Sequence, residues 1–309
     1  MRQTIALTVV SLLAPTLYAA DGAAAQGDSV DQESLVPISV THASSFIPFD
    51  PIANPEISLA ANTFLTIFGP ATGNGPSQEA LRIVPPGDPR IWSDSFVDRV
   101  APTSLDGVRV LINGKAGFIS YLARAESFFN VDFDQINLLA PDDDTRGLVT
   151  VEVLNGEQRV ATSMVNLGEV SPGLFAIKFG DISYVIARTA DTGRLLLDPD
   201  VLPTLETRPA RVGEVILMFG TGYGKTEPPL PTGELPPRFG GPWRIPDEVR
   251  ATIGGVEAAL EFAGISPCCV GVYQFNVKVP PLPDGNHLVT IETMNVNSQP
   301  DLWLTVANE

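Results

Sequence analysis

Four short segments of this chain occur twice in the same order, and this internal repeat constrains the fold more than any other feature. Residues 65–69 match 216–220, 108–109 match 249–250, 135–137 match 274–276, and 148–152 match 288–292. The offset is 151 residues for the first pair and between 139 and 141 residues for the other three. Because a match that keeps its order is the signature of a duplicated unit, the sequence predicts two domains of the same architecture.

The repeated segments have the alternating pattern of half-buried β-strands. Apolar residues occupy every second position in both copies, at Val149, Val151 and Val153 and again at Val289 and Ile291. A period of two places one row of side chains inward and the other outward. Turn signals separate the strands, namely Asn113-Gly114, Gly254-Gly255, Asn155-Gly156, Asp284-Gly285 and Asp191-Thr192-Gly193. One helical turn is expected, over residues 95–100, and the predicted fold class is all-β.

The strand spacing fits two tandem immunoglobulin-like β-sandwiches related by internal duplication, each of roughly seven strands and about 100 residues. The 309 residues of the chain are enough for two hydrophobic cores. We expect the first sandwich at residues 35–167 and the second at 208–309. The intervening segment, 168–207, is too apolar for a free tether, so we expect a connector with a hairpin that braces the two domains.

The N-terminus has the layout of a secretory signal peptide. Arg2 supplies a positive charge, residues 4–17 are largely apolar, and small residues between 19 and 25 offer cleavage sites. The apolar stretch is too short to span a bilayer, and the alternative is a short buried helix. We expect residues 1–25 to be removed and 26–34 to be disordered. The mature protein is then secreted, periplasmic or held at the cell surface, without membrane insertion.

Charge and motif content exclude several functions. The chain has 19 Lys and Arg against 36 Asp and Glu, a formal net charge of -17, which repels nucleic acid and anionic membranes. His42 and His287 are the two histidines, and no nucleophile-elbow motif is present, so a hydrolytic triad is not expected. We therefore predict no enzyme and no cofactor, although the many acidic residues leave a glycosidase-type pair open.

Two long loops hold the candidate ligand-binding residues. Residues 70–106 and 225–248 occupy corresponding places in the two copies, are rich in Pro and Gly, and contain one tryptophan each. Aromatic side chains on sandwich loops commonly stack on sugar rings. The alternative is that both indoles fold inward and cap their sandwiches, since exposed tryptophan is uncommon. The candidate residues are Trp92, Phe239, Trp243 and Arg244.

The two cysteines of the chain, Cys268 and Cys269, are adjacent. In an oxidising compartment they can form a vicinal disulfide, although neighbouring Cα atoms are about 3.8 Å apart and ordinary disulfides prefer about 4.4–6.8 Å. Such a bond closes almost no loop and so adds little chain-entropy stabilisation. It would stiffen the turn before Val270 or present a rigid sulfur edge to a ligand. Two free thiols or an intermolecular bridge are the alternatives.

A run of three carboxylates, Asp142, Asp143 and Asp144, fills a predicted turn between two strands. Adjacent carboxylates repel one another, so bound calcium would relieve them. The spacing is not that of an EF-hand loop, and a solvated turn is the simpler interpretation. No other metal site is predicted.

Several motifs in fixed order resemble a known family. They lie at residues 40–46, 65–69, 171–175, 219–224, 262–265 and 270–277. In this combination the chain resembles the uncharacterised Solibacter-type C-terminal domain family of secreted acidobacterial proteins, from about Val40 to Val306. Each half is also similar to an IPT/TIG immunoglobulin-like domain. The resemblance implies fold and export, and it implies no catalytic residues.

These observations predict a secreted, non-catalytic adhesion or recognition protein. Its expected ligand is a polysaccharide or an envelope protein, bound through the loops of Trp92 and Trp243. One alternative is a structural spacer or assembly module whose edge strands pair with a partner. Another is a secreted polysaccharide hydrolase with acidic residues in a cleft.

Overall fold

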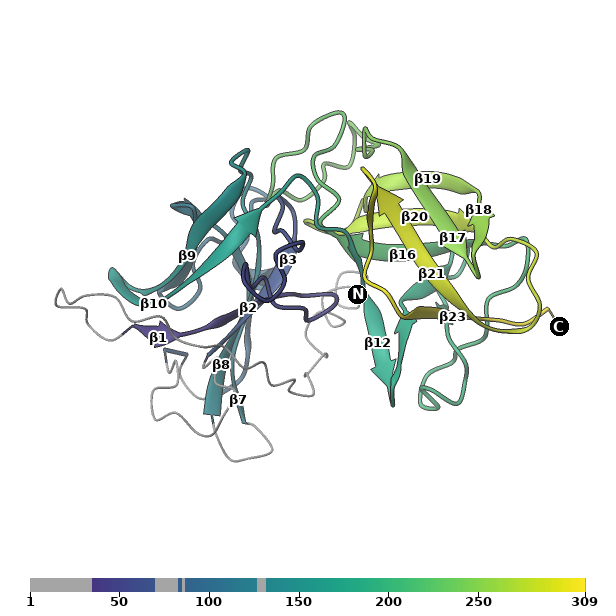
Figure 1. The fold of residues 1–309 in the computed structure, drawn as a ribbon, viewed down its shortest axis with the longest axis horizontal. Helices are drawn as coiled ribbons and strands as arrows, with labels where there is room; N and C mark the ends of the chain where they lie inside the picture. Colours follow the sequence, from purple (N-terminus) through teal and green to yellow (C-terminus); the bar gives the residue numbers. More distant parts are fainter. Residues whose placement is uncertain (1–34, 70–82, 85–86, 127–131, 309) are drawn as a thin grey trace. The chain divides into compact units, whose positions relative to one another are not determined.

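The computed structural model of the chain describes residues 35–69, 83–84, 87–126 and 132–308, and its regular secondary structure is almost entirely β-strand, joined by turns and loops (Figure 1). The predicted all-β class is confirmed. The expected signal peptide and the segment 26–34 lie outside the described residues. Within the described part, no helix is long and apolar enough to cross a membrane.

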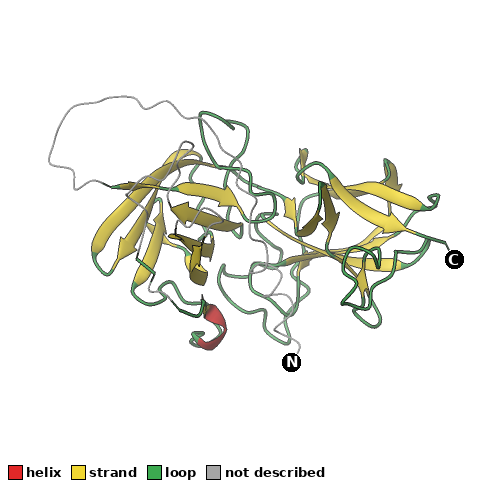
Figure 2. Cartoon of the chain, turned by 90° about the horizontal axis from the view of Figure 1, so that it is seen from below, coloured by secondary structure: helices red, strands yellow, loops and turns green. Residues whose placement is uncertain are grey.

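One short 3-10 helix, Trp92–Asp94, is the helical element of the described residues (Figure 2). The helical turn expected at residues 95–100 was therefore placed too late in the chain. Val97 and Val100 instead form two backbone hydrogen bonds with each other, with N···O distances of 3.1 and 2.8 Å. These bonds close a tight turn of the hairpin type.

The chain divides into two compact units. The N-terminal unit has its described residues within 35–59 and 64–168, and the C-terminal unit has them within 60–63 and 169–308. The C-terminal unit thus begins well before residue 208, where the second sandwich was expected.

The N-terminal unit consists of two five-stranded sheets. In order across the first sheet, the strands are β1 (Val36–Pro37), β10 (Gln158–Leu167), β9 (Gly147–Asn155), β5 (Val108–Ile112) and β6 (Lys115–Ala116). Across the second they are β2 (Ser39–His42), β3 (Phe64–Gly69), β8 (Asp132–Leu139), β7 (Phe118–Glu126) and β4 (Arg90–Ile91). One core holds inward side chains from both sheets, among them Leu65, Ile136, Val110 and Val151, so the sheets pack face to face.

The C-terminal unit also has two sheets. Across the first, the strands are β15 (Leu195–Leu196), β14 (Ala187–Thr189), β16 (Val215–Thr221), β20 (Tyr273–Lys278) and β19 (Leu260–Ile265), with β11 (Gly173–Leu174) also beside β16. Across the second they are β12 (Ala176–Phe179), β13 (Ile182–Val185), β23 (Leu302–Val306), β21 (Gly285–Thr293), β17 (Val249–Ile253) and β18 (Val256–Ala258), with β22 (Val296–Asn297) on β21.

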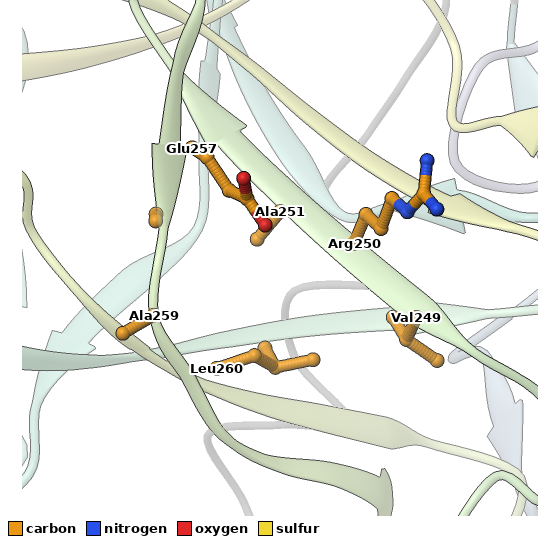
Figure 3. A pocket seen from close by; sticks show the side chains of 7 residues that line it. Val249, Arg250, Ala251, Glu257, Ala259 and Leu260 are labelled. Carbon is orange, nitrogen blue, oxygen red and sulfur yellow. The ribbon is translucent and has the colours of Figure 1, made fainter.

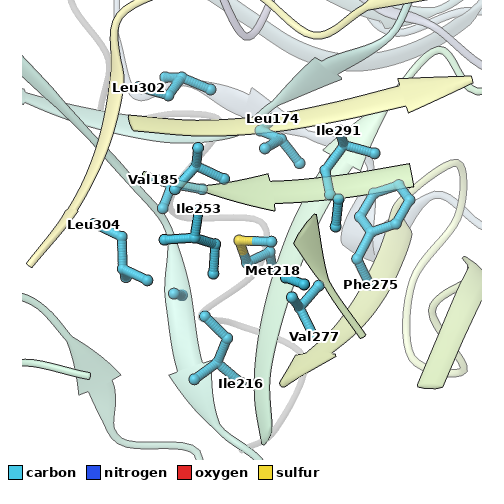
Figure 4. Packing of buried hydrophobic residues seen from close by; sticks show 14 of the residues in the cluster. Leu174, Val185, Ile216, Met218, Ile253, Phe275, Val277, Ile291, Leu302 and Leu304 are labelled. Atoms are coloured by element: carbon cyan, nitrogen blue, oxygen red, sulfur yellow. The ribbon is translucent and has the colours of Figure 1, made fainter. Parts of the chain in front are cut away.

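The core of the C-terminal unit again joins its two sheets. Met218 and Phe275 from the first sheet and Ile253 and Ile291 from the second belong to one buried cluster (Figure 4). The segment expected to be a connector contributes Leu174 and other residues to the same cluster. Its five strands, β11 to β15, all pair within this unit, so the segment is part of the C-terminal sheets rather than a separate brace.

Strand order is the same in the two units. The order β1-β10-β9-β5-β6 corresponds to β13-β23-β21-β17-β18, and β2-β3-β8-β7 corresponds to β14-β16-β20-β19. The four repeated segments lie on β3 and β16, β5 and β17, β8 and β20, and β9 and β21.

Two of the predicted turns are confirmed as hairpin turns by the backbone angles. Asn113 and Gly114 have φ of 52° and 74° between β5 and β6, and Gly254 and Gly255 have φ of 61° and 74° between β17 and β18. Positive φ at both central positions suits the right-handed twist of the flanking strands.

Candidate recognition groove

Both tryptophans proposed as ligand platforms are buried. Trp92 is 3% exposed and packs edge-on against Phe64 and Phe96, with ring centroids 5.9 and 5.5 Å apart. Trp243 is 7% exposed and belongs to the C-terminal core, where its ring lies against Gly241. Neither indole has a face free for a ligand, so the inward-facing alternative describes them, because burying so large an apolar side chain is strongly favourable.

The other two candidate residues lie at the surface. Phe239 is 83% exposed, and the guanidinium carbon of Arg238 is 5.9 Å from its ring centroid. Arg244 is exposed as well, and its guanidinium carbon lies 5.0 Å from the ring centroid of Phe262. Sequence reasoning missed Phe262, which a strand and a loop bring next to Arg244, and no local pattern indicates this contact.

The chain around Arg244 forms an extra strand on the edge of β19. Ile245 N donates to the carbonyl of Ala263 at 3.1 Å, and Ile265 N donates to the carbonyl of Trp243 at 2.9 Å. The N-terminal unit has a similar arrangement. Its strand β4, which ends immediately before Trp92, pairs with Tyr121 and Leu122 of the edge strand β7. Each tryptophan is therefore buried beside a short segment that covers an edge strand.

The two edge strands differ at their beginnings. Both have a bulge there: β7 between Ile119 and Tyr121, and β19 between Leu260 and Phe262. In the N-terminal unit the N–H of Ile119 donates to the carbonyl of Pro102 at 2.9 Å. Among the residues that the structure describes, no segment takes the place of Pro102 beside Leu260.

The length of the loop explains this difference. In the N-terminal unit, residues 92–107 lie between β4, which covers the edge of β7, and the beginning of β5, and they include Pro102. The C-terminal unit has residues 246–248 before β17 begins, too few to follow the edge of β19 and return. The beginning of β19 is therefore left uncovered by the described parts of its own unit.

The backbone of Leu260 points toward this uncovered side. Lys278 N donates to the carbonyl of Ala259 at 2.9 Å, and Leu260 stands opposite Val277 in the ladder. Because backbone groups alternate in direction along an antiparallel strand, the N–H and C=O of Leu260 point away from β20.

Two adjoining hollows lie along this edge and form what we call the β19 groove. The larger, about 430 Å³, is lined by Val249–Ala251 of β17 and by residues 257–260 (Figure 3). The smaller, about 170 Å³, lies between residues 244–249 and 260–263. Val249 and Leu260 line both hollows, and the other lining residues include Arg244, Asp247, Arg250, Glu257 and Phe262.

Charged side chains of both signs line the β19 groove, namely Arg244, Arg250, Asp247 and Glu257. Arg250 Nε lies 2.9 Å from a carboxylate oxygen of Glu248. This hydrogen bond, with the charges of Glu248, Glu292 and Glu257, raises the pKa of Arg250 above its ordinary value. The carboxylates of Asp247 and Glu257 add further negative charge to the lining. Arg244 and Arg250 balance these two carboxylates, so the charge of the lining does not select the sign of a bound segment.

Cys268 and Cys269 form the vicinal disulfide in the turn between β19 and β20. Cys269 is buried and Cys268 is exposed. Ser266 holds the turn, since its N–H donates to the carbonyl of Val272 at 2.8 Å and its hydroxyl lies 3.3 Å from Cys268 Sγ. The disulfide thus lies at the far end of β19 from Leu260, outside the groove lining.

The weak calcium candidate is a hydrogen-bonded turn. Asn113 Nδ2 and Thr145 N donate to the carboxylate of Asp143 at 2.9 and 2.8 Å, and Lys115 Nζ lies 3.4 Å from it. Partial burial raises the pKa of Asp143, but these hydrogen bonds and the Lys115 charge outweigh it and lower the pKa to about 2. In the described part of the chain, which includes Asp142, Asp143 and Asp144, no group of three or more His, Cys, Asp or Glu is placed to hold a metal ion.

Comparisons with known proteins give distant likenesses. No family model and no curated protein matches the sequence. SGBP-B of the Bacteroides ovatus mixed-linkage glucan utilization locus, solved with a mixed-linkage heptasaccharide, is similar at a TM-score of 0.28 and 14% identity, over 80% of this chain and 53% of that one. InvD of Yersinia pseudotuberculosis is similar at a TM-score of 0.21 and 9% identity, over 82% and 54%. The chain spans about half the length of these two proteins, and similarities at this level carry no assignment of function.

Proposed function

We propose that the two units are immunoglobulin-like β-sandwiches that arose by duplication of one domain. The matching strand orders, the bulges at the same place in β7 and β19, and the repeated segments on corresponding strands support this origin. The signal-like layout of residues 1–25 supports export of the protein from the cytoplasm.

We propose further that the chain is a non-catalytic recognition protein that binds an extended polypeptide segment of a partner in the β19 groove. One observation carries this proposal. The groove follows the stretch of β19 that no described segment covers; Leu260 lines it, and the N–H of Leu260 points away from β20. An exposed sheet edge pairs readily with an added strand, and a polypeptide supplies the matching carbonyl and amide groups.

The chain itself shows that this edge accepts a strand. Trp243 and Ile245 already form two ladder hydrogen bonds with the other end of β19. A partner segment would continue this pairing toward Leu260 and cover the apolar side chains of Val249 and Phe262. Each net hydrogen bond contributes about 0.5–1.5 kcal/mol, and the buried apolar surface contributes about 25 cal/mol per Å². A short segment then binds weakly, in about the micromolar to millimolar range.

Selection from a random peptide library tests the proposal on the full chain. Ala259 is exposed and lines the groove, so Ala259→Trp fills the groove with an indole. Ile52 is 91% exposed, and Ile52→Trp is the matched control that adds an indole elsewhere. We expect selected peptides to bind the wild type and Ile52→Trp equally, and Ala259→Trp at least about tenfold more weakly. Equal binding to all three, or no selected peptide, contradicts the proposal.

A polysaccharide is the second candidate ligand, because Arg244 stacked on Phe262 offers a flat polar and aromatic surface at the same groove. Affinity electrophoresis in gels that contain soluble polysaccharides tests it. Retardation of the wild type that is lost in a folded Arg244→Ala/Phe262→Ala variant would favour this candidate over a polypeptide. The hydrolase alternative stays a prediction, which an activity assay on the same polysaccharides tests.

A further inference from the structure

We propose that the disulfide between Cys268 and Cys269 is a reversible redox site, which an external dithiol reduces while the protein stays folded. The proposal goes beyond recognition in the β19 groove, because the disulfide lies at the far end of β19 and takes no part in the groove lining. The substrate class is a dithiol, and the product on the protein is a pair of adjacent thiols in the turn between β19 and β20.

One sulfur of the pair is open to a reductant. Cys268 is exposed, whereas Cys269 is 7% exposed. The neighbouring Pro267 is exposed too, and residues 266–272 contain no charged side chain that would repel an incoming thiolate. A thiolate must reach a disulfide sulfur to break the bond, so the attack takes place at Cys268 Sγ.

The turn does not depend on the disulfide to keep its ends together. Ser266 N donates to the carbonyl of Val272 at 2.8 Å, and neither sulfur takes part in this bond. Ile265 pairs with Tyr273 in the ladder just outside the turn. Because the disulfide joins neighbouring residues, it closes almost no loop and adds little chain-entropy stabilisation. We therefore expect the β19–β20 hairpin to survive reduction.

Adjacency of the two cysteines also favours reduction. A peptide link holds neighbouring Cα atoms about 3.8 Å apart, below the about 4.4–6.8 Å of ordinary disulfides, and bonds outside that range are easier to reduce. Exposed disulfides of this kind are typically the labile ones, in contrast to the structural disulfides that lock distant parts of a chain.

Ser266 is placed to stabilise the reduced form. Gln274 Nε2 donates to Asn276 Oδ1 at 2.8 Å, which leaves the carbonyl oxygen of the Gln274 side chain for Ser266. The Ser266 hydroxyl donates its one proton to this oxygen, at 3.3 Å. A lone pair of the same hydroxyl is then left for Cys268 Sγ, which lies 3.3 Å away.

This lone pair is an acceptor that a thiol can use and a disulfide cannot. A disulfide sulfur has no proton to donate, so the oxidised Cys268 does not donate to Ser266. After reduction the Cys268 S–H can donate to Ser266 Oγ, which continues the chain of bonds to Gln274. A hydrogen bond that exists in the reduced state alone shifts the redox equilibrium toward that state.

The exchange takes two steps and conserves atoms and electrons. A thiolate of the dithiol attacks Cys268 Sγ, the S–S bond breaks, and Cys269 leaves as a thiolate that takes up a proton. The second thiol of the reductant loses its proton, attacks the mixed disulfide and releases Cys268, which is protonated in turn. The cysteine pair gains two electrons and two protons, and the dithiol is oxidised to a disulfide. A disulfide oxidant reverses both steps.

Thiol counting under native conditions tests the proposal. The full chain is incubated with about 1 mM dithiothreitol at pH about 7.5 without denaturant, alkylated with iodoacetamide and weighed by intact mass spectrometry. We expect two thiols per chain, an unchanged far-UV CD spectrum, and return to the original mass when oxidised glutathione replaces the dithiol. A bond that resists the dithiol until urea unfolds the chain overturns the proposal, as does a reduction that removes the CD signal of the β-sheets.

Variants that lack one hydroxyl test the role of Ser266. Ser266→Ala removes the acceptor, and Ser93→Ala is the matched control, since Ser93 is exposed in the N-terminal unit. In mixtures of dithiothreitol and its oxidised form, we expect the ratio of reduced to oxidised protein to be at least about threefold lower in a folded Ser266→Ala than in the wild type, and unchanged in Ser93→Ala. Equal ratios in all three proteins would overturn the role of Ser266.

Discussion

The N–H of Ile119 donates to the carbonyl of Pro102 at 2.9 Å, and Leu260, which has the same place in the C-terminal unit, has no such acceptor among the described residues. The two units therefore use one edge in different ways. The N-terminal unit covers it with residues of its own long loop, and the C-terminal unit, with residues 246–248 in that place, leaves a groove.

Proline substitutions at the two positions should differ in their cost. Ile119→Pro removes an internal hydrogen bond and leaves the Pro102 carbonyl without its donor, so we expect it to lower the free energy of unfolding by about 1–3 kcal/mol more than Ile119→Ala. Leu260→Pro removes no internal bond of this kind, and we expect it to differ from Leu260→Ala by less than about 0.5 kcal/mol. Urea unfolding of the four variants measures both differences, and equal differences would show that the edge at Leu260 is not open.

The tryptophans should behave as core residues. Because Trp243 is 7% exposed and Trp92 is 3% exposed, we expect Trp243→Ala and Trp92→Ala each to lower the free energy of unfolding of its unit by about 3–5 kcal/mol. Phe239→Ala is the control, because an 83% exposed side chain contributes within about 0.5 kcal/mol. Wild-type stability in either tryptophan variant would show that the indole is exposed in the wild type, and would make it a candidate ligand platform again.

Periodicity and turn chemistry predicted the strands well, because both are local. The alternating valines of β9 are inward and buried, and Asn113-Gly114 makes the turn that its sequence demands. The helical turn was misplaced because residues 95–100 show no strong period. The extent of the C-terminal unit was also mistaken, since β11, β13 and β14 pair with strands that are distant in the sequence.

The candidate site was predicted only in part for the same reason. Arg244 was singled out from its loop, but its contact with Phe262 depends on how that loop returns along β19. The burial of Trp92 and Trp243 likewise depends on tertiary packing, which a loop composition does not encode. The open edge at Leu260 is visible only when the two units are compared strand by strand.

Stability should depend on the ionisation of Asp143. Its pKa is about 2 in the folded protein and about 3.9 in an unfolded chain, so the carboxylate stabilises the fold above pH 4 and this contribution is lost as the pH falls toward 2. After allowance for screening we expect Asp143→Asn to cost about 1–2 kcal/mol at pH 6. Unfolding measured between pH 6 and 2.5 should show the gap between variant and wild type closing, and a constant gap would contradict this origin.

The vicinal disulfide should contribute little to global stability. It joins residues one position apart, so its loss releases almost no loop entropy, and we expect Cys268→Ala/Cys269→Ala to change the free energy of unfolding by less than about 1 kcal/mol. Thermal unfolding with and without a dithiol reductant gives the same comparison in the wild type. A disulfide that closes a 15-residue loop contributes about 3 kcal/mol to the free energy of unfolding. A loss of that size here would mean that the turn at Ser266 contributes more to stability than its contacts indicate.

Amide hydrogen exchange at Leu260 tests the central claim most directly. In the free full chain we expect this N–H to exchange at least about a hundredfold faster than that of Ile119, because an amide without a partner is open to water. On addition of a groove-binding peptide, the exchange of Leu260 should slow and that of Ile119 should stay unchanged. Protection of Leu260 equal to that of Ile119 in the free protein would show that the edge is already occupied, and would contradict recognition by strand addition.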